Sequence, residues 1–248
     1  MYVEADRAVM MKPVLSHKAF FVGRSEQRQL THSASAAFSL GAHAARRAFP
    51  DMFPSLDGAT SMMEEIRRHG ARTASVACEI GFELGLTSRL IETLLTAATV
   101  HDVGKALIDP PTLASSAALS AQGMVAMREH TRLGQQLIAE SFKSHPMTAK
   151  AIGEVVLYHH ERWDGFGYPN GLRGREIPLL ARIVAVADVF DALVSARSYK
   201  SAWTTQRAID EISAGRGTQF DPACVDAFMR RVDEIVFARE QFSFGQVC

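Results

Sequence analysis

The sequence predicts an all-α protein built as a helical bundle, with a shorter and less regular region at its N-terminus. Apolar residues recur at spacings of three and four through most of the chain after residue 58, which is the pattern of amphipathic helices. The alternation of apolar and polar residues that marks a half-buried strand is hardly visible. Segments rich in proline and glycine separate the helical stretches, as turns between helices require.

A domain boundary is expected near residue 57, because "FPDMFPSLDG" contains prolines and a glycine that break a helix. Residues 1–57 are mixed in composition, and we assign them no role. Residues 58–248 are expected to form the functional domain. The helices predicted in it run from Ile66 to Leu86, Leu90 to His101, Met124 to Phe142, Ala149 to His160, Leu179 to Ser195, Thr205 to Ile212 and Pro222 to Phe237.

Composition argues against several classes of protein. The 248 residues are 47% hydrophobic and 22% charged, which is typical of a soluble globular chain. Since 27 Lys and Arg balance 27 Asp and Glu, the net charge does not indicate binding to duplex DNA or to an anionic membrane. Cys78, Cys224 and Cys248 follow no metal-binding or secretory spacing, which favours reduced thiols in the cytoplasm. Neither a signal peptide nor a membrane span is indicated.

Histidine and aspartate occur together in "TVHDVGK", at the end of an apolar helix. His101 and Asp102 are adjacent, and Lys105 follows His101 by four residues, which predicts that the two share a helical face. Imidazole is the commonest metal donor in proteins, and carboxylate oxygens can bridge cations. Taken alone, the motif favours a His–Asp pair at a helix end, held by capping and the helix dipole.

Further donors lie in or at the ends of helices that a bundle can direct at one centre. Asp188 occurs in the apolar segment "ARIVAVADVFDAL", where an unpaired carboxylate is costly unless a cation meets it. Asp191, one turn later, is expected to have a supporting or structural role. Glu65 precedes His69 by one turn and shares its helix face, whereas Glu64 points about 100° away. The histidines of this group are His69, His130, His159 and His160.

These residues resemble the HD superfamily of metal-dependent phosphohydrolases, and specifically its HD-GYP branch of cyclic di-GMP phosphodiesterases. The resemblance runs from about Met62 to Phe228. It rests on "HDVGK", "REHTRLG", "GTQFDP" and the long block "HHERWDGFGYPNGLRGREIPLLARIVAVADVFDALVSARSYK". It implies that Asp102 bridges two metal ions and that Glu65 helps to hold a third. The metal ligands it implies are His69, His101, Asp102, His130, His159, His160 and Asp188.

The resemblance also implies substrate contacts. Tyr168 of the "GYP" loop would line the substrate mouth, and Lys105 would contact the phosphate. Arg197 and Lys200 in "ARSYKSA" would project to one side of a helix and bind phosphate, although two exposed cations can equally form a solvated surface. The chain departs from the family pattern in "ALIDPPTLASSAALS", which lacks a KPG element, and at Gly70, where serine is common.

The function that the resemblance implies is hydrolysis of cyclic di-GMP to linear pGpG and, after a second cut, to GMP. Two or three divalent ions would activate a water for attack on phosphorus, with Lys105 stabilising the developing charge. The mixed nitrogen and oxygen donors suit Fe or Mn, and ligand types alone are also compatible with Zn, Co or Ni.

Two alternatives remain at this point. The substrate could be another cyclic dinucleotide. The chain could instead be a cyclic di-GMP sensor with little turnover that docks a signalling partner, such as a diguanylate cyclase, through the GYP loop. A homodimer is also compatible with the sequence.

Overall fold

The computed structural model describes residues 61–109, 112, 120–195 and 202–244, which form a bundle of helices. No strand occurs in these ranges, where a single isolated bridge joins Arg216 to Phe220. The predicted all-α class is therefore confirmed. The expected boundary near residue 57 lies outside the described residues and stays a prediction. The α-helices are α2 (Ser61–Glu83), α3 (Ser88–Val100), α5 (Ala121–Arg128), α6 (His130–Ser141), α7 (Pro146–Tyr158), α8 (Leu179–Val194), α9 (Thr205–Ala214), α10 (Pro222–Arg230) and α11 (Val232–Phe244).

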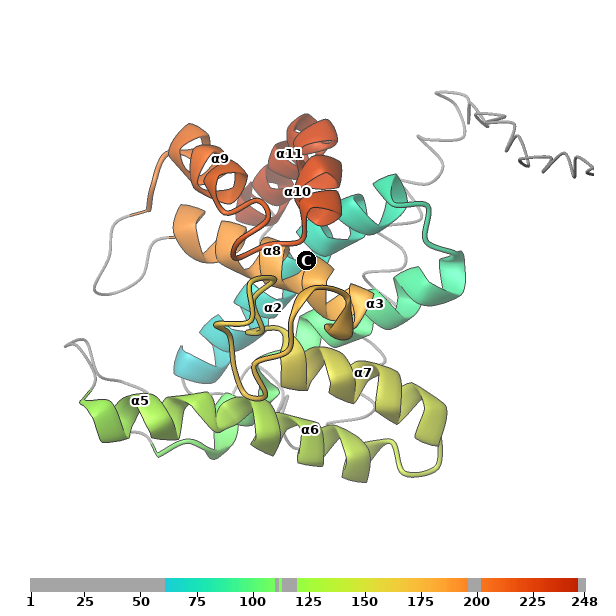
Figure 1. Ribbon diagram of the computed structural model, residues 1–248, viewed down its shortest axis with the longest axis vertical. Coiled ribbons are helices and arrows are strands. Elements are labelled where there is room, and N and C mark those ends of the chain that lie inside the picture. Colours follow the sequence, from blue (N-terminus) through green and yellow to red (C-terminus); the bar gives the residue numbers. More distant parts are fainter. Residues whose placement is uncertain (1–60, 110–111, 113–119, 196–201, 245–248) are drawn as a thin grey trace, which may run out of the picture.

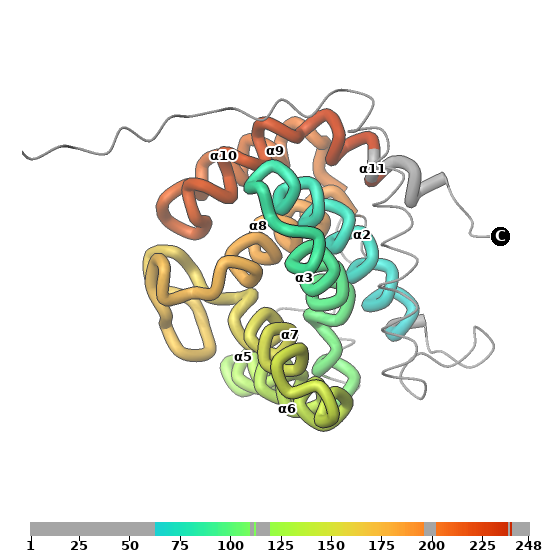
Figure 2. The backbone as a smooth tube through the Cα atoms, turned by 90° about the vertical axis from the view of Figure 1, so that its right-hand side faces the viewer, coloured from blue at the N-terminus to red at the C-terminus, as the bar shows by residue number. Residues whose placement is uncertain are grey.

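Helices α2, α3 and α8 form the middle of the molecule, with α5 to α7 at one end and α9 to α11 at the other (Figures 1 and 2). Helix α2 packs against α3, α8, α10 and α11, while α7 packs against α3, α6 and α8. Fully buried side chains such as Leu94, Ile183 and Phe228 fill the interior between these helices. Removal of this apolar surface from water is the main stabilising contribution to such a bundle.

Residues near the helix starts explain where several helices begin. Thr87 and Thr204 cap α3 and α9 with hydroxyls that accept backbone hydrogen bonds. Pro146 and Pro222 lie in the first turns of α7 and α10, where a missing N–H removes no helical bond.

Two predicted helices are each divided in the structure. The helix expected from Met124 to Phe142 breaks at Glu129 into α5 and α6, and the helix expected from Pro222 to Phe237 breaks at Arg231 into α10 and α11. At the second break, the Arg231 guanidinium bonds to the buried carboxylate of Glu79 on α2. The apolar spacing continues through both breaks, so periodicity alone did not reveal them.

Two glycines allow the elements around the interior to approach closely. A Cβ atom on Gly104 would lie 1.9 Å from the carbonyl oxygen of His130, and one on Gly70 would lie 2.2 Å from that of Thr99. Both obstacles are backbone atoms, which cannot swing aside as a flexible side chain can. The glycine at position 70, where the resemblance leads one to expect serine, is thus explained by the close contact between α2 and α3.

Cys78 and Cys224 are free, buried thiols, and burial raises the pKa of both well above the usual value. Each is therefore protonated and inert at neutral pH, whereas Cys248 lies outside the described residues. Within the described ranges, every helix is too short or too polar to cross a lipid bilayer.

Candidate metal centre

Seven of the predicted donors converge in the interior, where α2 and the middle of α8 meet the C-terminal ends of α3, α5 and α7. Their ligand atoms form three overlapping groups, within each of which all the atoms lie within 4.8 Å of one another. Six of the seven side chains are buried, and His160 is partly buried. The groups are Asp102, His130, His159 and His160; His69, His101 and Asp102; and His101, His159 and Asp188.

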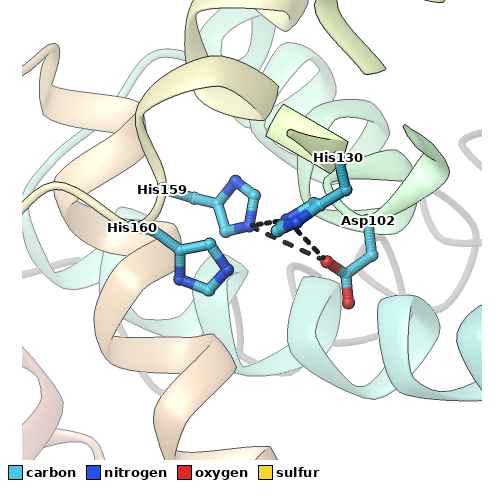
Figure 3. Close-up of side chains that lie close together, drawn as sticks. All are labelled: Asp102, His130, His159 and His160. Carbon is cyan, nitrogen blue, oxygen red and sulfur yellow. Dashed lines mark hydrogen bonds and ion pairs between the residues drawn. The ribbon is translucent and has the colours of Figure 1, made fainter. Parts of the chain in front are cut away.

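The carboxylate of Asp102 is shared by two of these groups and faces two pairs of histidines. Its Oδ1 lies 3.4 Å from His130 Nε2 and 3.8 Å from His159 Nε2 (Figure 3). Its Oδ2 lies 3.4 Å from His101 Nε2 and 3.9 Å from His69 Nε2. One carboxylate thus presents a separate oxygen to each pair, as a ligand that bridges two cations must do.

Three of the histidine rings are held in one orientation by the backbone. His101, His130 and His159 contact, through Nδ1, the carbonyl oxygen three residues earlier at 2.7, 2.6 and 2.9 Å. Each follows the last turn of a helix, where carbonyls have no helical N–H partner. A carbonyl oxygen can only accept, so Nδ1 carries the proton in each bond. In the neutral ring the lone pair is then on Nε2, which points toward Asp102.

Two buried atoms at the centre have unsatisfied bonding capacity. His101 Nε2 and Asp102 Oδ1 lack a hydrogen-bond partner among the described residues. Buried polar atoms in folded proteins rarely remain unpaired. Both are metal-donor atoms, one a nitrogen and one a carboxylate oxygen, so divalent cations would satisfy them. The residues present therefore fit a metal centre.

On one side of the centre the histidines are neutral. Burial lowers the pKa of His159 well below its usual value, and the neighbouring His160 and His101 lower it further. Burial also lowers the pKa of His160, to about 3, and that of His130. All three rings are therefore uncharged at neutral pH and have a nitrogen lone pair available for a cation.

On the other side the carboxylates attract positive charge. Burial opposes ionisation of both carboxylates. Lys105 and His101 nevertheless hold the pKa of Asp102 well below its usual range. His101 and His69 do the same for the pKa of Asp188. Burial likewise opposes charge on His101, yet Asp102 and Asp188 raise its pKa to about 10. Positive charge is therefore strongly favoured where these side chains meet, as a site for a cation requires.

Lys105 contacts Asp102 rather than sharing a helix face with His101. Helix α3 ends at Val100, and a 3-10 turn, η1 (Val103–Leu107), follows. The Lys105 ammonium lies 2.5 Å from Asp102 Oδ2. The predicted spacing of four along one helix was wrong because the helix stops before the motif, and the tighter turn places the lysine over the carboxylate instead.

The loop after α7 is held in place by Glu161, a buried residue for which the sequence predicted no role. Its carboxylate accepts hydrogen bonds from the backbone N–H groups of Asn170 at 2.7 Å and Leu172 at 3.1 Å. Backbone bonds from Trp163 and Asp164 tie the same loop to the "GTQFDP" segment. An acidic residue directly before a glycine-rich loop was the available signal in the sequence.

Tyr168 of this loop lies beside the donors. Its ring stacks on His160, with centroids 4.8 Å apart and planes 29° apart, and the Arg128 guanidinium lies 4.9 Å from its centroid. Gly167 permits this placement, because a Cβ there would lie 2.3 Å from the backbone nitrogen of Arg162. Tyr168 thus lies at the edge of the cluster, where the resemblance implies the substrate mouth.

Other predicted site residues are not brought to the centre. Glu65 belongs to none of the three donor groups, and its half-exposed carboxylate lies 3.4 Å from Arg72 Nη2. Glu64 points elsewhere, as expected, and bonds to arginines of its own helix. Arg197 and Lys200 lie outside the described residues, so their phosphate contacts stay predictions.

Asp191 has the supporting position that was expected of it, and its partners come from distant parts of the chain. It is fully buried, and its Oδ2 lies 2.8 Å from His69 Nδ1. Burial opposes its charge, but His69 and Arg72 lower its pKa to about 2. Arg72, 119 positions away in the chain, and Arg239, 48 positions away, both bond to it. A spacing pattern within one helix cannot predict contacts between residues so far apart.

The chain matches a family model, the HD domain, over residues 56–224. The cyclic di-GMP phosphodiesterase response regulator RpfG of Xanthomonas campestris is 43% identical over 187 residues, which is 75% of this chain and 47% of that protein. The 3'3'-cGAMP-specific phosphodiesterase 2 of Vibrio cholerae is 38% identical over 176 residues, 70% of this chain and 33% of that protein. The chain therefore spans less than half the length of either relative.

A solved structure has a similar fold. Bd1817, an HDG"Y"P protein from Bdellovibrio bacteriovorus, aligns with a TM-score of 0.57 and 18% sequence identity. The alignment covers 82% of this chain and 63% of that one. At this identity the likeness bears on the fold alone.

Proposed function

Because this chain belongs to the HD domain family, we propose that it is a metal-dependent phosphodiesterase that hydrolyses cyclic di-GMP. The observation that carries the proposal is the Asp102 carboxylate, whose two oxygens face separate pairs of histidine nitrogens. The relatives named as cyclic dinucleotide phosphodiesterases support the substrate class.

In this proposal the clustered donors would hold two divalent ions, and Asp102 would contribute a carboxylate oxygen to each. The ligands are the seven clustered donors, His69, His101, Asp102, His130, His159, His160 and Asp188. The position of Glu65 favours two ions over three, because its carboxylate contacts Arg72 and lies outside the donor groups. Mixed imidazole and carboxylate ligation suits Fe or Mn.

The protein's own groups would bind and orient the phosphodiester. The chemistry that divalent ions would supply there is Lewis acidity and activation of a water as nucleophile. Lys105, whose ammonium already lies against Asp102, would contact a phosphoryl oxygen and stabilise the charge that develops on it. Tyr168 would contact the substrate at the mouth, and Arg197 and Lys200 would bind its phosphates.

The test is a comparison of substrates on one preparation. The protein is purified without added metal, analysed for elements, and then assayed with Mn²⁺ or Fe²⁺ against cyclic di-GMP, 3'3'-cGAMP and cyclic di-AMP. We expect pGpG to form from cyclic di-GMP only when metal is bound, with GMP as the product of a second cut. Asp102→Asn should lose this activity, whereas Asp109→Asn, an exposed aspartate nearby, should retain it.

Two other outcomes would replace the proposal. Faster turnover of 3'3'-cGAMP would make that dinucleotide the substrate, an option supported by the Vibrio cholerae relative. Tight binding of cyclic di-GMP by metal-loaded protein without turnover would indicate a sensor, one that docks a partner such as a diguanylate cyclase through the GYP loop.

A further inference from the structure

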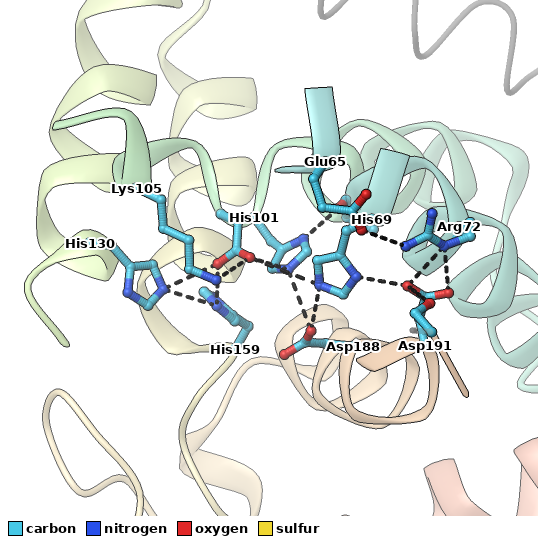
Figure 4. Close-up of polar contacts among 12 residues, drawn as sticks. Glu65, His69, Arg72, His101, Lys105, His130, His159, Asp188 and Asp191 are labelled. Carbon is cyan, nitrogen blue, oxygen red and sulfur yellow. Dashed lines mark hydrogen bonds and ion pairs between the residues drawn. The ribbon is translucent and has the colours of Figure 1, made fainter. Parts of the chain in front are cut away.

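The imidazole of His69 is held from both sides. Its Nδ1 lies 2.8 Å from Asp191 Oδ2, and its Nε2 lies 2.9 Å from Asp188 Oδ1 (Figure 4). Asp188 belongs to the donor cluster, whereas Asp191 lies one turn further along α8 and outside the donor groups. The Asp191 carboxylate therefore determines which ring nitrogen of His69 is presented to the cluster.

Asp191 is itself an anion with no exposure to solvent. A buried carboxylate is stable only when paired and hydrogen-bonded. Arg72 Nε lies 2.9 Å from its Oδ1 and 3.1 Å from its Oδ2, and the Ser195 hydroxyl donates to Oδ2 at 3.2 Å. Arg239 Nε adds a bond to Oδ1 at 3.3 Å. Two guanidinium groups thus enclose the carboxylate that orients His69.

Arg239 comes from α11, which lies beyond residue 224, where the match to the HD domain model ends. Its Nη2 also donates to the Val194 carbonyl and to Ser195 Oγ, each at 2.9 Å. These bonds fasten the guanidinium to the C-terminal end of α8, the helix that carries both Asp188 and Asp191. A single side chain therefore links α11 to the support of the donor cluster.

We propose that Arg239 is a positioning residue for the metal centre. It holds Asp191 so that His69 directs its Nε2 toward the other metal-binding side chains. Helix α11 thereby becomes part of the functional unit, although the family match does not include it. The inference rests on the proposed metal site, and it concerns affinity for metal and ring orientation rather than any contact with substrate.

The experiment measures Mn²⁺ affinity in the full chain, by competition with a chelating dye, for Arg239→Met and a matched control. The control is Arg230→Met, which removes an exposed arginine bonded to Glu83 and has no link to Asp191. Replacement of a residue that hydrogen-bonds to a metal ligand typically weakens metal affinity by about 10–100-fold. We expect about a tenfold loss for Arg239→Met, a larger loss for Asp191→Asn, and no change for Arg230→Met.

The second readout is the ¹⁵N chemical shifts of the His69 ring nitrogens in metal-free, histidine-labelled protein. They should move in Arg239→Met and in Asp191→Asn, and remain in place in Arg230→Met. If Arg239→Met does not fold, Arg239→Lys decides, since lysine retains the charge but has no planar fork to bond several acceptors at once; its His69 signals should shift toward those of Asp191→Asn.

The outcomes separate the two levels of inference. Wild-type protein that binds no Mn²⁺ or Fe²⁺ would overturn the proposed function and this inference together. Wild-type protein that binds Mn²⁺, with unchanged affinity and unchanged His69 signals in the Arg239 variants, would overturn the role of Arg239 alone.

Discussion

Gly104→Ala should destabilise the protein by about 1–3 kcal/mol, the usual range for an overpacked interior. Gly104 lies in η1, between Asp102 and the start of α6. The added Cβ would lie 1.9 Å from the carbonyl oxygen of His130 and 2.6 Å from the backbone nitrogen of Gly134, whereas ordinary contact begins at 3.4 Å. Relief therefore requires η1 and α6 to separate by roughly 1.5 Å in a close-packed region.

Gly153→Ala is the matched control, because the same chemical change should not destabilise the protein there. Gly153 lies inside α7, and its added Cβ would lie 3.4 Å from Gln135 Cγ and 3.9 Å from Ile138 Cγ2, which are ordinary contacts with side chains. Alanine is favoured over glycine within a helix by up to about 1 kcal/mol. We therefore expect this variant to be as stable as the wild type or more stable.

Urea unfolding of the metal-free proteins, followed by far-UV circular dichroism, measures both changes. Because Gly104→Ala separates the elements that carry Asp102 and His130, it should also weaken Mn²⁺ binding, and Gly153→Ala should not. If Gly104→Ala is as stable as wild-type protein and binds Mn²⁺ equally well, the close contact between η1 and α6 does not position these donors.

Three further predictions concern site residues. Asp102→Asn should abolish hydrolysis and leave the circular dichroism spectrum unchanged. It should weaken metal binding by more than the about 10–100-fold that is typical when a residue bonded to a metal ligand is replaced. Normal turnover would exclude Asp102 as the bridging ligand. Glu65→Ala and Glu64→Ala should both leave about two ions per chain by elemental analysis, because Glu65 pairs with Arg72; loss of an ion in Glu65→Ala alone would support a third metal. Arg197→Ala and Lys200→Ala should each weaken cyclic di-GMP binding by about 1.5–3 kcal/mol at constant metal content, and normal affinity would mean that "RSYK" is a solvated surface.

The local sequence pattern was sufficient to predict the all-α class and the family. Helical periodicity depends on residues three and four apart, and the phosphohydrolase motifs are runs of consecutive residues, so both can be recognised in the sequence. The helix breaks at Glu129 and Arg231 were not legible, since each occurs within a continuous apolar pattern. The Arg231 break coincides with a bond to Glu79, 152 positions away.

The candidate donors could be named from the sequence because histidine and aspartate have a distinctive metal chemistry. Only the tertiary structure decided how they are arranged: that Asp102 presents one oxygen to each of two histidine pairs, that Lys105 lies over Asp102, and that Glu65 turns to Arg72. The support of His69 by Asp191, Arg72 and Arg239 was likewise decided by packing. These contacts join residues far apart in the chain, and their directions follow from how the helices cross and where each helix ends, which no spacing within a single helix determines.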